Sequence, residues 1–340
     1  MKSTIHAYAA AKAGGPLTPF DYEAGPLGHD QVEIKVHYCG VCHSDLSMLD
    51  NEWQMSAYPF VPGHEVAGKI VAVGEHVTHL KVGQLVGLGW NSASCLTCPT
   101  CMAGDHNLCP TAEMTMIGRH GGFADRVRCQ AAWAIPIPTG VDAALAGPLF
   151  CGGVTVFNPL VQFGVKPTDR VGVVGIGGLG HLAVKFLNKW GCEVTAFTSS
   201  EKKADEARKF GAHNVVASGD SQKLAALAGS LNFILVTANV TLDWNAYLNA
   251  LAPKGRLHVV GAVLQPMPIP AMTLLTGQRS VSGSPLGSPA TTMKMLAFCA
   301  RHNITPTTEL FPMSKVNEAM AHLRAGKARY RLVLQNDFRD

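Results

Sequence analysis

The hydrophobic positions of this chain follow two different patterns. Up to about residue 90 the apolar residues come in short runs, and in Val32-Glu33-Ile34-Lys35-Val36 they alternate with charged residues. Alternation of this kind predicts half-buried strands. Further strands are predicted at 66–73 and 85–88, with turn-forming residues at Gly74 and 81–84 between them. Many short strands separated by Gly and Pro predict a barrel-like β domain.

From residue 171 the pattern changes to buried strands alternating with helical segments. Strands are predicted at 171–174, 193–197, 214–217, 233–237 and 256–260, with helices at 181–190, 202–210, 222–228 and 242–251. Such alternation is typical of a doubly wound parallel sheet, so the fold class is α/β. After about residue 285 the pattern is mixed, with helices predicted at 291–300 and 315–326 and a strand at 331–334.

Composition narrows the class of protein. A chain of 340 residues predicts two domains, and 47% hydrophobic with 15% charged residues indicates a soluble globular protein. The net charge of +4 is spread along the chain, so nucleic acid is not an expected partner. The N-terminus lacks the apolar run of a signal peptide, and no membrane span is predicted. We therefore expect a cytoplasmic protein whose ten cysteines are thiols or thiolates.

Four of these cysteines lie close together in a lobe at about residues 91–110. They form C-x-x-C-x-x-C followed by a fourth cysteine eight positions later: Cys95, Cys98, Cys101 and Cys109. Four thiolates at this spacing predict a closed tetrahedral zinc site, whose ion supplies folding energy to a lobe with little apolar material. Two disulfides and an iron–sulfur cluster are the alternatives. Because protein atoms fill every position, the predicted role of this ion is structural.

A glycine-rich segment links the first predicted strand of the second pattern to its helix. Residues 175–180 read G-x-G-x-x-G, and the strand–turn–helix context gives this motif its meaning. Glycines let the backbone approach a pyrophosphate, and the helix N-terminus offers free N–H groups. Dinucleotide binding is therefore predicted, with Gly175, Gly177, Gly178, Leu179 and Gly180 at the cofactor.

The residues after the second strand of this region bear on the choice of cofactor. An NAD-binding fold normally has Asp or Glu about 19 residues beyond the glycine motif. Here the chain has Thr198-Ser199-Ser200-Glu201-Lys202-Lys203. Ser199, Ser200 and Lys203 suit a 2′-phosphate, which predicts NADPH, although Glu201 leaves NADH open.

A second metal site is predicted from residues far apart in the sequence. Cys42, His64 and Cys151 provide two thiolates and one imidazole, which leaves one position of a tetrahedral zinc ion open to substrate. This ligand set suits polarisation of a carbonyl by a Lewis acid. Glu65 is a further possible ligand, and Asp45 is the expected partner that orients a ligand.

The residues quoted above resemble those of the zinc-dependent medium-chain alcohol dehydrogenases. The resemblance is strongest to the cinnamyl-alcohol-dehydrogenase-like branch and to its bacterial broad-substrate NADPH-dependent aldehyde reductases. It covers nearly the whole chain and also includes Gly147-Pro148-Leu149-Phe150-Cys151-Gly152-Gly153, Lys327-Ala328-Arg329-Tyr330-Arg331, Asn51-Glu52-Trp53 and the segment 307–315.

The resemblance implies a domain plan and further site residues. A GroES-like catalytic domain is expected from 1–153 and 286–340, with a Rossmann NADP-binding domain at 154–285, an active site in the cleft between them, and a homodimer. Cofactor contacts are implied for Thr155, Val260, Ser282, Ser284 and Arg331. The substrate pocket is implied for Trp53 and Trp90, for which core packing is the alternative.

The activity implied is reversible, zinc-dependent reduction of aldehydes to primary alcohols by NADPH. Ser44 is the expected first proton carrier. Many relatives have a histidine five positions after the first ligand cysteine, whereas this chain has Ser47. Beyond Ser44 the proton is therefore expected to pass either through His43 or through the ribose hydroxyls and water. The alternatives are NAD-dependent oxidation of a primary alcohol or polyol, a zinc-free quinone reductase, and an NADPH-binding sensor with a vestigial site.

Overall fold

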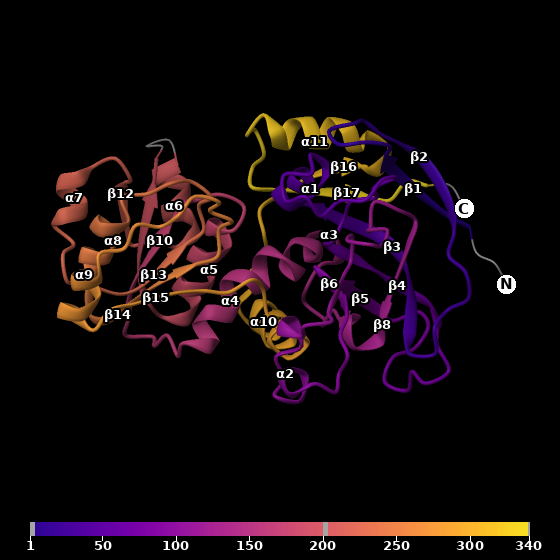
Figure 1. Cartoon of the computed structure of the whole chain (residues 1–340), viewed down its shortest axis with the longest axis horizontal. Coiled ribbons are helices and arrows are strands. Elements are labelled where there is room, and N and C mark those ends of the chain that lie inside the picture. Colours follow the sequence, from indigo (N-terminus) through magenta and orange to yellow (C-terminus); the bar gives the residue numbers. More distant parts are fainter. Residues whose placement is uncertain (1–3, 200–202, 339–340) are drawn as a thin grey trace. The chain divides into compact units, whose positions relative to one another are not determined.

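The computed structural model describes residues 4–199 and 203–338. The chain forms two compact units, one made of Met1–Val154 with Gly287–Asp340 and the other of Thr155–Leu286 (Figure 1). The first unit is rich in antiparallel strands and the second has a parallel sheet with helices. The predicted α/β class, with a β-rich part and a doubly wound part, is confirmed.

The first unit is built on a mixed, mostly antiparallel sheet. Within the described residues its strands in spatial order are β16 (Thr308–Pro312), β17 (Arg331–Gln335), β3 (Gln31–Val41), β4 (Val66–Val73), β5 (Leu85–Leu88) and β9 (Ile135–Pro136), with β8 (Arg126–Gln130) also paired to β3. Two smaller pairs are β1 (Thr4–Ala10) with β2 (Leu17–Glu23), and β6 (Asn91–Ala93) with β7 (Glu113–Met114).

Short helices connect these strands. The α-helices of this unit are α1 (His43–Leu49), α2 (Pro99–Met102), α3 (Ala143–Ala146), α10 (Pro289–His302) and α11 (Val316–Arg324). Single 3-10 turns are η1 (His106–Leu108), η2 (Ala131–Trp133), η3 (Gly147–Phe150) and η5 (Met313–Lys315). The core between strands and helices contains large fully buried side chains such as Phe60, Phe123 and Met48.

Strand β3 shows why the alternating pattern was only partly informative. Val32, Ile34 and Val36 are fully buried, as the pattern predicts for one face. Glu33, on the other face, is also buried, because its carboxylate accepts hydrogen bonds from Arg126 and Arg128 on the neighbouring β8. A charge is tolerated there because it is paired on both oxygens.

Strand β17 brings the C-terminal region back to the middle of this sheet. It pairs in parallel with β16 and antiparallel with β3, and the register places Leu332 opposite Val41. Residue 331 therefore lies beside the chain segment that follows β3, where Cys42, a predicted metal ligand, is located.

The second unit contains a wholly parallel sheet. Its strands in spatial order are β12 (Asn214–Ala217), β11 (Glu193–Thr198), β10 (Arg170–Val174), β13 (Leu231–Val236), β14 (Leu251–Val259) and β15 (Ser280–Gly283). The helices are α5 (Gly180–Trp190), α6 (Ala204–Phe210), α7 (Ser221–Ala225), α8 (Trp244–Ala250) and α9 (Ala271–Gly277), while α4 (Gly152–Gln162) begins just before the unit. The strand order reverses between β10 and β13, which is where open α/β sheets bind ligands.

Several helices are shorter or longer than the sequence pattern predicts. The segment predicted as helical at 222–228 is helical only in α7, whereas α10 extends beyond both ends of 291–300. Local side chains explain where these helices begin: Asp220 and Ser288 cap their first turns by accepting backbone N–H bonds.

Among the described residues no single helix has the length and apolar character needed to cross a membrane. One pair, Ala143–Phe150 with Gly152–Gln162, meets that test jointly by length and composition, with a bend of 56°.

Candidate metal centres and cofactor site

Four side chains from distant parts of the first unit converge on one point. Cys42 immediately precedes α1, His64 and Glu65 precede β4, and Cys151 follows η3. One ligand atom from each lies within 4.8 Å of the others. The Sγ atoms of Cys42 and Cys151 are 3.9 Å apart, and His64 Nε2 lies 3.3 Å from the Cys151 Sγ. Tetrahedral zinc, with bonds of about 2.0–2.3 Å, separates its ligand atoms by about 3.4–3.8 Å, so these residues fit the ion.

A buried carboxylate holds this arrangement together. Asp45 is fully buried, and its Oδ1 accepts the backbone N–H of Gly63 at 2.9 Å and lies 3.1 Å from His64 Nδ1. Its Oδ2 accepts the backbone N–H of Cys42 at 2.8 Å. One side chain therefore fixes both ligand loops and turns the His64 ring so that Nε2 faces the sulfurs.

The protonation states of the ligands reflect their proximity. A hydrogen bond from Cys151 lowers the pKa of the Cys42 thiol well below its usual value, against the opposing effect of burial. For His64, burial by itself lowers the pKa of the imidazole. The charge and hydrogen bond of Asp45 outweigh this effect and raise the pKa of His64 well above its usual value. A thiolate among closely packed ligands is the form that binds a metal ion.

Glu65 is buried next to the ligands and is paired with an arginine from β17. The Arg331 guanidinium donates to Glu65 Oε1, and both side chains are buried. Among residues 4–199 and 203–338, Glu65 Oε2 and Arg331 Nε have no hydrogen-bond partner. A buried carboxylate oxygen without a partner is costly, so Oε2 is chemically suited to an additional ligand of the ion.

Glycines create the space that Glu65 occupies. A Cβ on Gly40 would lie 2.0 Å from Glu65 Oε2, and a Cβ on Gly147 would lie 2.4 Å from the Glu65 carbonyl oxygen. Any side chain at either position would displace the glutamate. The glycines of Gly40-Val41-Cys42 and Gly147-Pro148 are thus explained by close packing around one residue.

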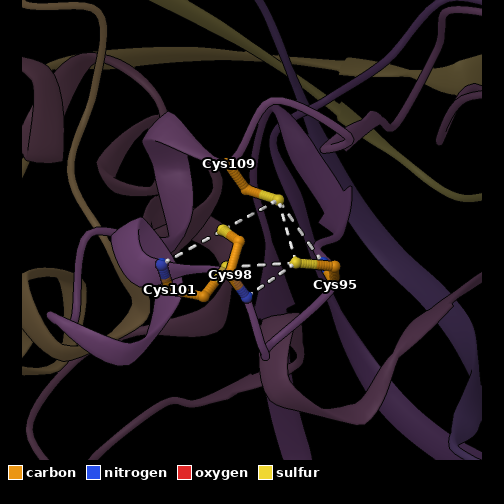
Figure 2. Close-up of side chains that lie close together, drawn as sticks. All are labelled: Cys95, Cys98, Cys101 and Cys109. Atoms are coloured by element: carbon orange, nitrogen blue, oxygen red, sulfur yellow. Dashed lines mark hydrogen bonds between the residues drawn. The ribbon is translucent and has the colours of Figure 1, made fainter.

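The four lobe cysteines form the second metal-ligand group (Figure 2). Three Sγ pairs are 3.6–4.0 Å apart, namely Cys95–Cys109, Cys95–Cys101 and Cys98–Cys109. These separations fit four sulfurs around one zinc ion, whose S···S distance is about 3.8 Å, and are far longer than the roughly 2.05 Å of a disulfide. The disulfide alternative is therefore not supported, and the group leaves room for a single ion.

Backbone N–H groups stabilise the thiolates of this lobe. The N–H groups of Cys98 and Cys101 donate to the sulfurs of Cys95 and Cys98 at 3.3 and 3.5 Å. Hydrogen bonds from the backbone of Thr97 and Cys98 lower the pKa of Cys95 to about 5. Burial instead raises the pKa of Cys101 to about 12, a rise that a bound cation would counter.

In the second unit, the predicted glycine motif lies between β10 and α5. Gly175 has a left-handed backbone, with φ of +91°, and a Cβ there would meet Ala238 at 2.9 Å. Nothing lies within 4 Å of a Cβ built on Gly177, which leaves that backbone open to a ligand. A Cβ on Gly180 would lie 1.8 Å from the Gly175 carbonyl oxygen, so the helix can begin there only with glycine. These are the three functions expected of the dinucleotide-binding motif.

Two family models match the chain. The alcohol dehydrogenase GroES-like domain covers residues 28–139, and the zinc-binding dehydrogenase model covers 178–301. The chain is 56% identical to aldehyde reductase AdhA of Synechocystis sp. over 332 residues, which are 98% of this chain and 99% of that one. The chain belongs to the zinc-binding alcohol dehydrogenases with a GroES-like domain.

Solved structures of other members of this alcohol dehydrogenase family have the same fold. A cinnamyl alcohol dehydrogenase from Sorghum bicolor matches with a TM-score of 0.94 and 38% identity, covering 98% of each chain. The enzyme from Helicobacter pylori complexed with NADP(H) matches with a TM-score of 0.91 and 30% identity, covering 98% of this chain and 99% of that one. The family resemblance seen in the sequence is confirmed.

The predicted proton carriers and substrate-pocket residues of this alcohol dehydrogenase lie around the first metal site. Ser44 is partly exposed, with Oγ 3.7 Å from the Cys42 Sγ, and His43 is exposed. The ring centroid of Trp90 lies 5.0 Å from that of His64 and 6.0 Å from that of Trp53, both edge to face. Trp90 therefore adjoins the metal site through His64, and Trp53 contacts Trp90. Both tryptophans are partly exposed and also pack against the hydrophobic core.

Two residues predicted to contact the cofactor lie near the glycine motif and after β11, respectively: Lys203 and Ser199. Lys203 Nζ donates to the carbonyl oxygen of Ile176 at 3.3 Å, and Ser199 is exposed just after β11. Ser200 lies outside the described residues. Thr155 is buried in α4, and Val260 is partly exposed immediately after β14.

The structure adds residues that the sequence pattern did not single out. His258 is fully buried, with Nδ1 2.9 Å from Ser282 Oγ and Nε2 2.9 Å from Ser284 Oγ. The pairing of Arg331 with Glu65 was also unforeseen, since Arg331 was assigned to the cofactor alone. This contact arises from the register of β17 against β3, which pairs residues about 290 positions apart. No local sequence pattern indicates such a pairing.

Proposed function

We propose that the protein is a zinc-dependent, NADPH-dependent aldehyde reductase that converts aldehydes to primary alcohols reversibly. The observation that carries this proposal is the convergence of Cys42, His64 and Cys151 with Asp45 behind the imidazole. Supporting it are the 56% identity to an aldehyde reductase and the fold shared with an enzyme complexed with NADP(H).

The proposed metal ligands are three residues of the first site and four of the lobe. Cys42, His64 and Cys151 hold the catalytic ion, with Glu65 as an additional ligand, and Cys95, Cys98, Cys101 and Cys109 hold the structural ion. When bound, the catalytic zinc supplies a Lewis acid for the carbonyl oxygen, and NADPH supplies the hydride. The protein's own residues provide orientation, shielding from water and a proton.

The proton is proposed to come from Ser44. Its hydroxyl is partly exposed and lies beside the Cys42 sulfur, so it borders the ligand set without belonging to it. A hydroxyl can donate its proton and be reprotonated from solvent or from the exposed His43. Ser47, which occupies the place of the expected histidine, is itself buried on α1 and faces the core.

The pair Glu65 and Arg331 is proposed to adjust the charge of the site. A zinc ion with two thiolate ligands is already largely neutralised, so it needs less negative charge from a further carboxylate than an ion held only by histidines. The guanidinium neutralises the carboxylate when it is not a ligand and leaves Oε2 available. Arg331 Nε remains a donor for the cofactor pyrophosphate, which is the role expected from the sequence.

Cofactor preference is proposed to depend on the residues after β11. Ser199 and Lys203 provide a hydroxyl and a cation, and Ser200 is a third expected contact. The cofactor would lie over the glycine motif from Gly175 to Gly180, and Thr155, Val260, Ser282 and Ser284 would contact its nicotinamide end. Trp53 and Trp90 are the proposed walls for an aliphatic or aromatic aldehyde.

A cytoplasmic location and a homodimer complete the proposal. None of the ten cysteines, all of which belong to the described residues, forms a disulfide, which is expected in a reducing compartment. Strand β15 ends the parallel sheet, and α9 next to it exposes Met272 and Leu275. An edge strand beside exposed apolar side chains favours pairing with a second copy.

Steady-state kinetics and a metal count test the proposed function together. Aldehydes from short aliphatic to cinnamyl should be reduced with NADPH at a higher kcat/KM than with NADH, and the purified enzyme should hold two zinc ions per chain. Cys42→Ala should hold one zinc ion and lose turnover, whereas Cys39→Ala, which changes a neighbouring buried thiol, should keep both ions. A kcat/KM ratio below one would reverse the cofactor assignment, and activity in Cys42→Ala would refute the metal role.

A further inference from the structure

A third group of potential metal ligands lies on the surface of the first unit, away from both sites above. His29 is in the loop between β2 and β3, and Glu75 and His76 are in the loop after β4. One ligand atom from each lies within 4.8 Å of the others. All three side chains are about two-thirds exposed or more. None of them belongs to the proposed catalytic or structural site.

Two imidazole nitrogens flank one carboxylate oxygen in this group. Glu75 Oε1 lies 2.8 Å from His29 Nδ1 and 3.4 Å from His76 Nε2. The two imidazole rings are stacked, with centroids 5.3 Å apart and planes 28° from parallel. Both rings therefore direct a nitrogen to the same place, which is how two imidazoles and a carboxylate bind one cation.

The backbone fixes the two loops against each other before any ion binds. The N–H of His76 donates to the His29 carbonyl oxygen at 2.9 Å, and the N–H of Gly74 donates to that of Gln31 at 2.7 Å. A Cβ on Gly74 would lie 2.3 Å from the carbonyl oxygens of Gly28 and His29. Only glycine allows this close approach, so the ligand loops are held in register by more than the side chains.

We propose that His29, Glu75 and His76 bind a divalent transition-metal ion of the Zn²⁺, Ni²⁺ or Cu²⁺ class. Imidazole nitrogens with one carboxylate suit these ions, whereas Ca²⁺ and Mg²⁺ prefer oxygen ligands. In a tetrahedral site with bonds of about 2.1 Å the ligand atoms are about 3.4 Å apart. The distance from His76 Nε2 to Glu75 Oε1 already has this value, and His29 Nδ1 lies closer to the same oxygen, at 2.8 Å. All three side chains are exposed, so they can adjust to an ion.

This third site differs from the other two in accessibility. Its ligands are solvated, so water competes for the ion and the ion exchanges with the medium. Three protein ligands leave at least one position open to water. The proposal therefore predicts an exchangeable ion that is absent after dialysis against a chelator too weak to remove the two zinc ions of the thiolate-containing sites.

A metal titration of the full-length protein holding its two zinc ions tests the proposal. With Zn²⁺ added in a non-chelating buffer, equilibrium dialysis and elemental analysis should show one further ion per chain. His29→Ala and His76→Ala should each weaken that binding at least tenfold. His79→Ala, which removes an exposed histidine of the same loop, should leave it unchanged. A missing third equivalent, or equal loss in His79→Ala, would overturn the assignment.

Nuclear magnetic resonance of the same samples gives a readout that does not depend on stability. Substoichiometric Cu²⁺ or Ni²⁺ should broaden the imidazole signals of His29 and His76 before those of the other exposed histidines. Broadening that begins elsewhere would place the ion outside this cluster.

A separate observation, in the second unit, concerns His258. Its ring is fully buried on β14, and each nitrogen has a serine hydroxyl 2.9 Å away, Ser282 at Nδ1 and Ser284 at Nε2. A neutral imidazole has one donor and one acceptor, so one serine donates to the ring and the other accepts from it. Both hydroxyls are thus fixed by one side chain.

The place of these serines gives the histidine its importance. Within the described part of a single chain, β15 pairs only with β14, so Ser282 is on an edge strand, and Ser284 follows Gly283, the last paired residue. The ladder alone leaves this end of the edge strand weakly held. Resting on the proposed NADPH function, we infer that His258 is a positioning residue that holds the segment 282–284 in place for the nicotinamide.

Three substitutions test this inference. His258→Leu removes both hydrogen bonds, whereas His258→Asn can replace the one at Nδ1 and His258→Gln the one at Nε2. In His258→Leu the KM for NADPH should rise at least tenfold while the KM for the aldehyde stays constant, and at least one amide variant should recover part of the loss. An unchanged NADPH KM in a folded His258→Leu protein would refute the inference. If the unmodified enzyme did not bind NADPH, measured by nicotinamide fluorescence, the proposed function itself would fail instead.

Discussion

Asp45 Oδ1 lies 3.1 Å from His64 Nδ1, and both side chains are fully inaccessible to solvent. The same carboxylate receives backbone N–H groups from the two loops that carry Cys42 and His64. Its contribution is therefore geometric as well as electrostatic. Because Asp45 contacts the His64 nitrogen that does not face the metal site, loss of the carboxylate should weaken zinc binding without removing a ligand.

Asp45→Asn keeps the size of the side chain but removes its charge. We expect the affinity for the catalytic zinc to fall by about 10- to 100-fold, since the imidazole loses the partner that orients it and raises its basicity. Competition with a chromogenic chelator measures this affinity, and the lobe zinc is the internal reference. Equal affinity in the variant and the unmodified protein would show that the backbone alone orients His64.

Cys101→Ser should release the lobe zinc and leave the catalytic zinc in place. Cys101 is buried, with its Sγ 4.0 Å from that of Cys95, and a serine hydroxyl is a poor zinc ligand. The zinc content should fall from two ions to one per chain, and limited proteolysis should begin within 95–109. Cys299→Ala, which removes a buried sulfur outside the lobe, is the matched control and should retain two ions.

Ser199→Asp should reverse the preference for NADPH over NADH. The exposed residue just after β11 is where a carboxylate would bond the ribose hydroxyls and repel a 2′-phosphate. The ratio of kcat/KM values for the two cofactors should fall by at least tenfold, mainly through a higher KM for NADPH. Ser199→Asn introduces a side chain of the same size without the charge, and a similar effect there would argue for crowding instead of repulsion.

Stability should decrease in mildly acidic solution because of His258. Burial, with a smaller contribution from the nearby Arg256, lowers the pKa of this imidazole to about 4. The unfolded chain takes up the proton near pH 6.5, so the folded state loses relative stability as the pH falls from about 6.5 to about 4. The loss from this group approaches about 3 kcal/mol at the lower limit. The free energy of unfolding in urea, compared between pH 7 and pH 5 for the unmodified protein and His258→Gln, measures it; an identical slope in both would exclude this origin.

Sequence alone predicted much of the chemistry because metal ligands and glycine turns have restrictive requirements. The cysteine spacing of the lobe and the glycines at 175, 177 and 180 each have one physical purpose, and the structure shows those residues in matching environments. Cys42, His64 and Cys151 were also predicted, although no local pattern connects residues 109 positions apart. They were grouped by the ligands that an open zinc site needs, and the family resemblance agreed with that grouping.

Packing between distant strands was not predictable in the same way. Glu33 reads as a solvent-facing residue of an alternating strand, yet it is buried because two arginines of β8 reach it. Arg331 reads as a cofactor residue near the C-terminus, yet it also pairs with Glu65 through the register of β17. Both features depend on which strands become neighbours, and periodicity carries no information on that.

The position of β17 also sets the order in which the active site can be completed during synthesis. The metal ligands emerge from the ribosome by residue 151, but their neighbouring glutamate stays without its counter-charge until Arg331 follows 180 residues later (331 − 151). The entire parallel-sheet unit is made in the interval. A nascent chain can therefore bind zinc in its cysteine lobe early, whereas the catalytic site reaches its final charge balance only after nearly the whole polypeptide has been translated.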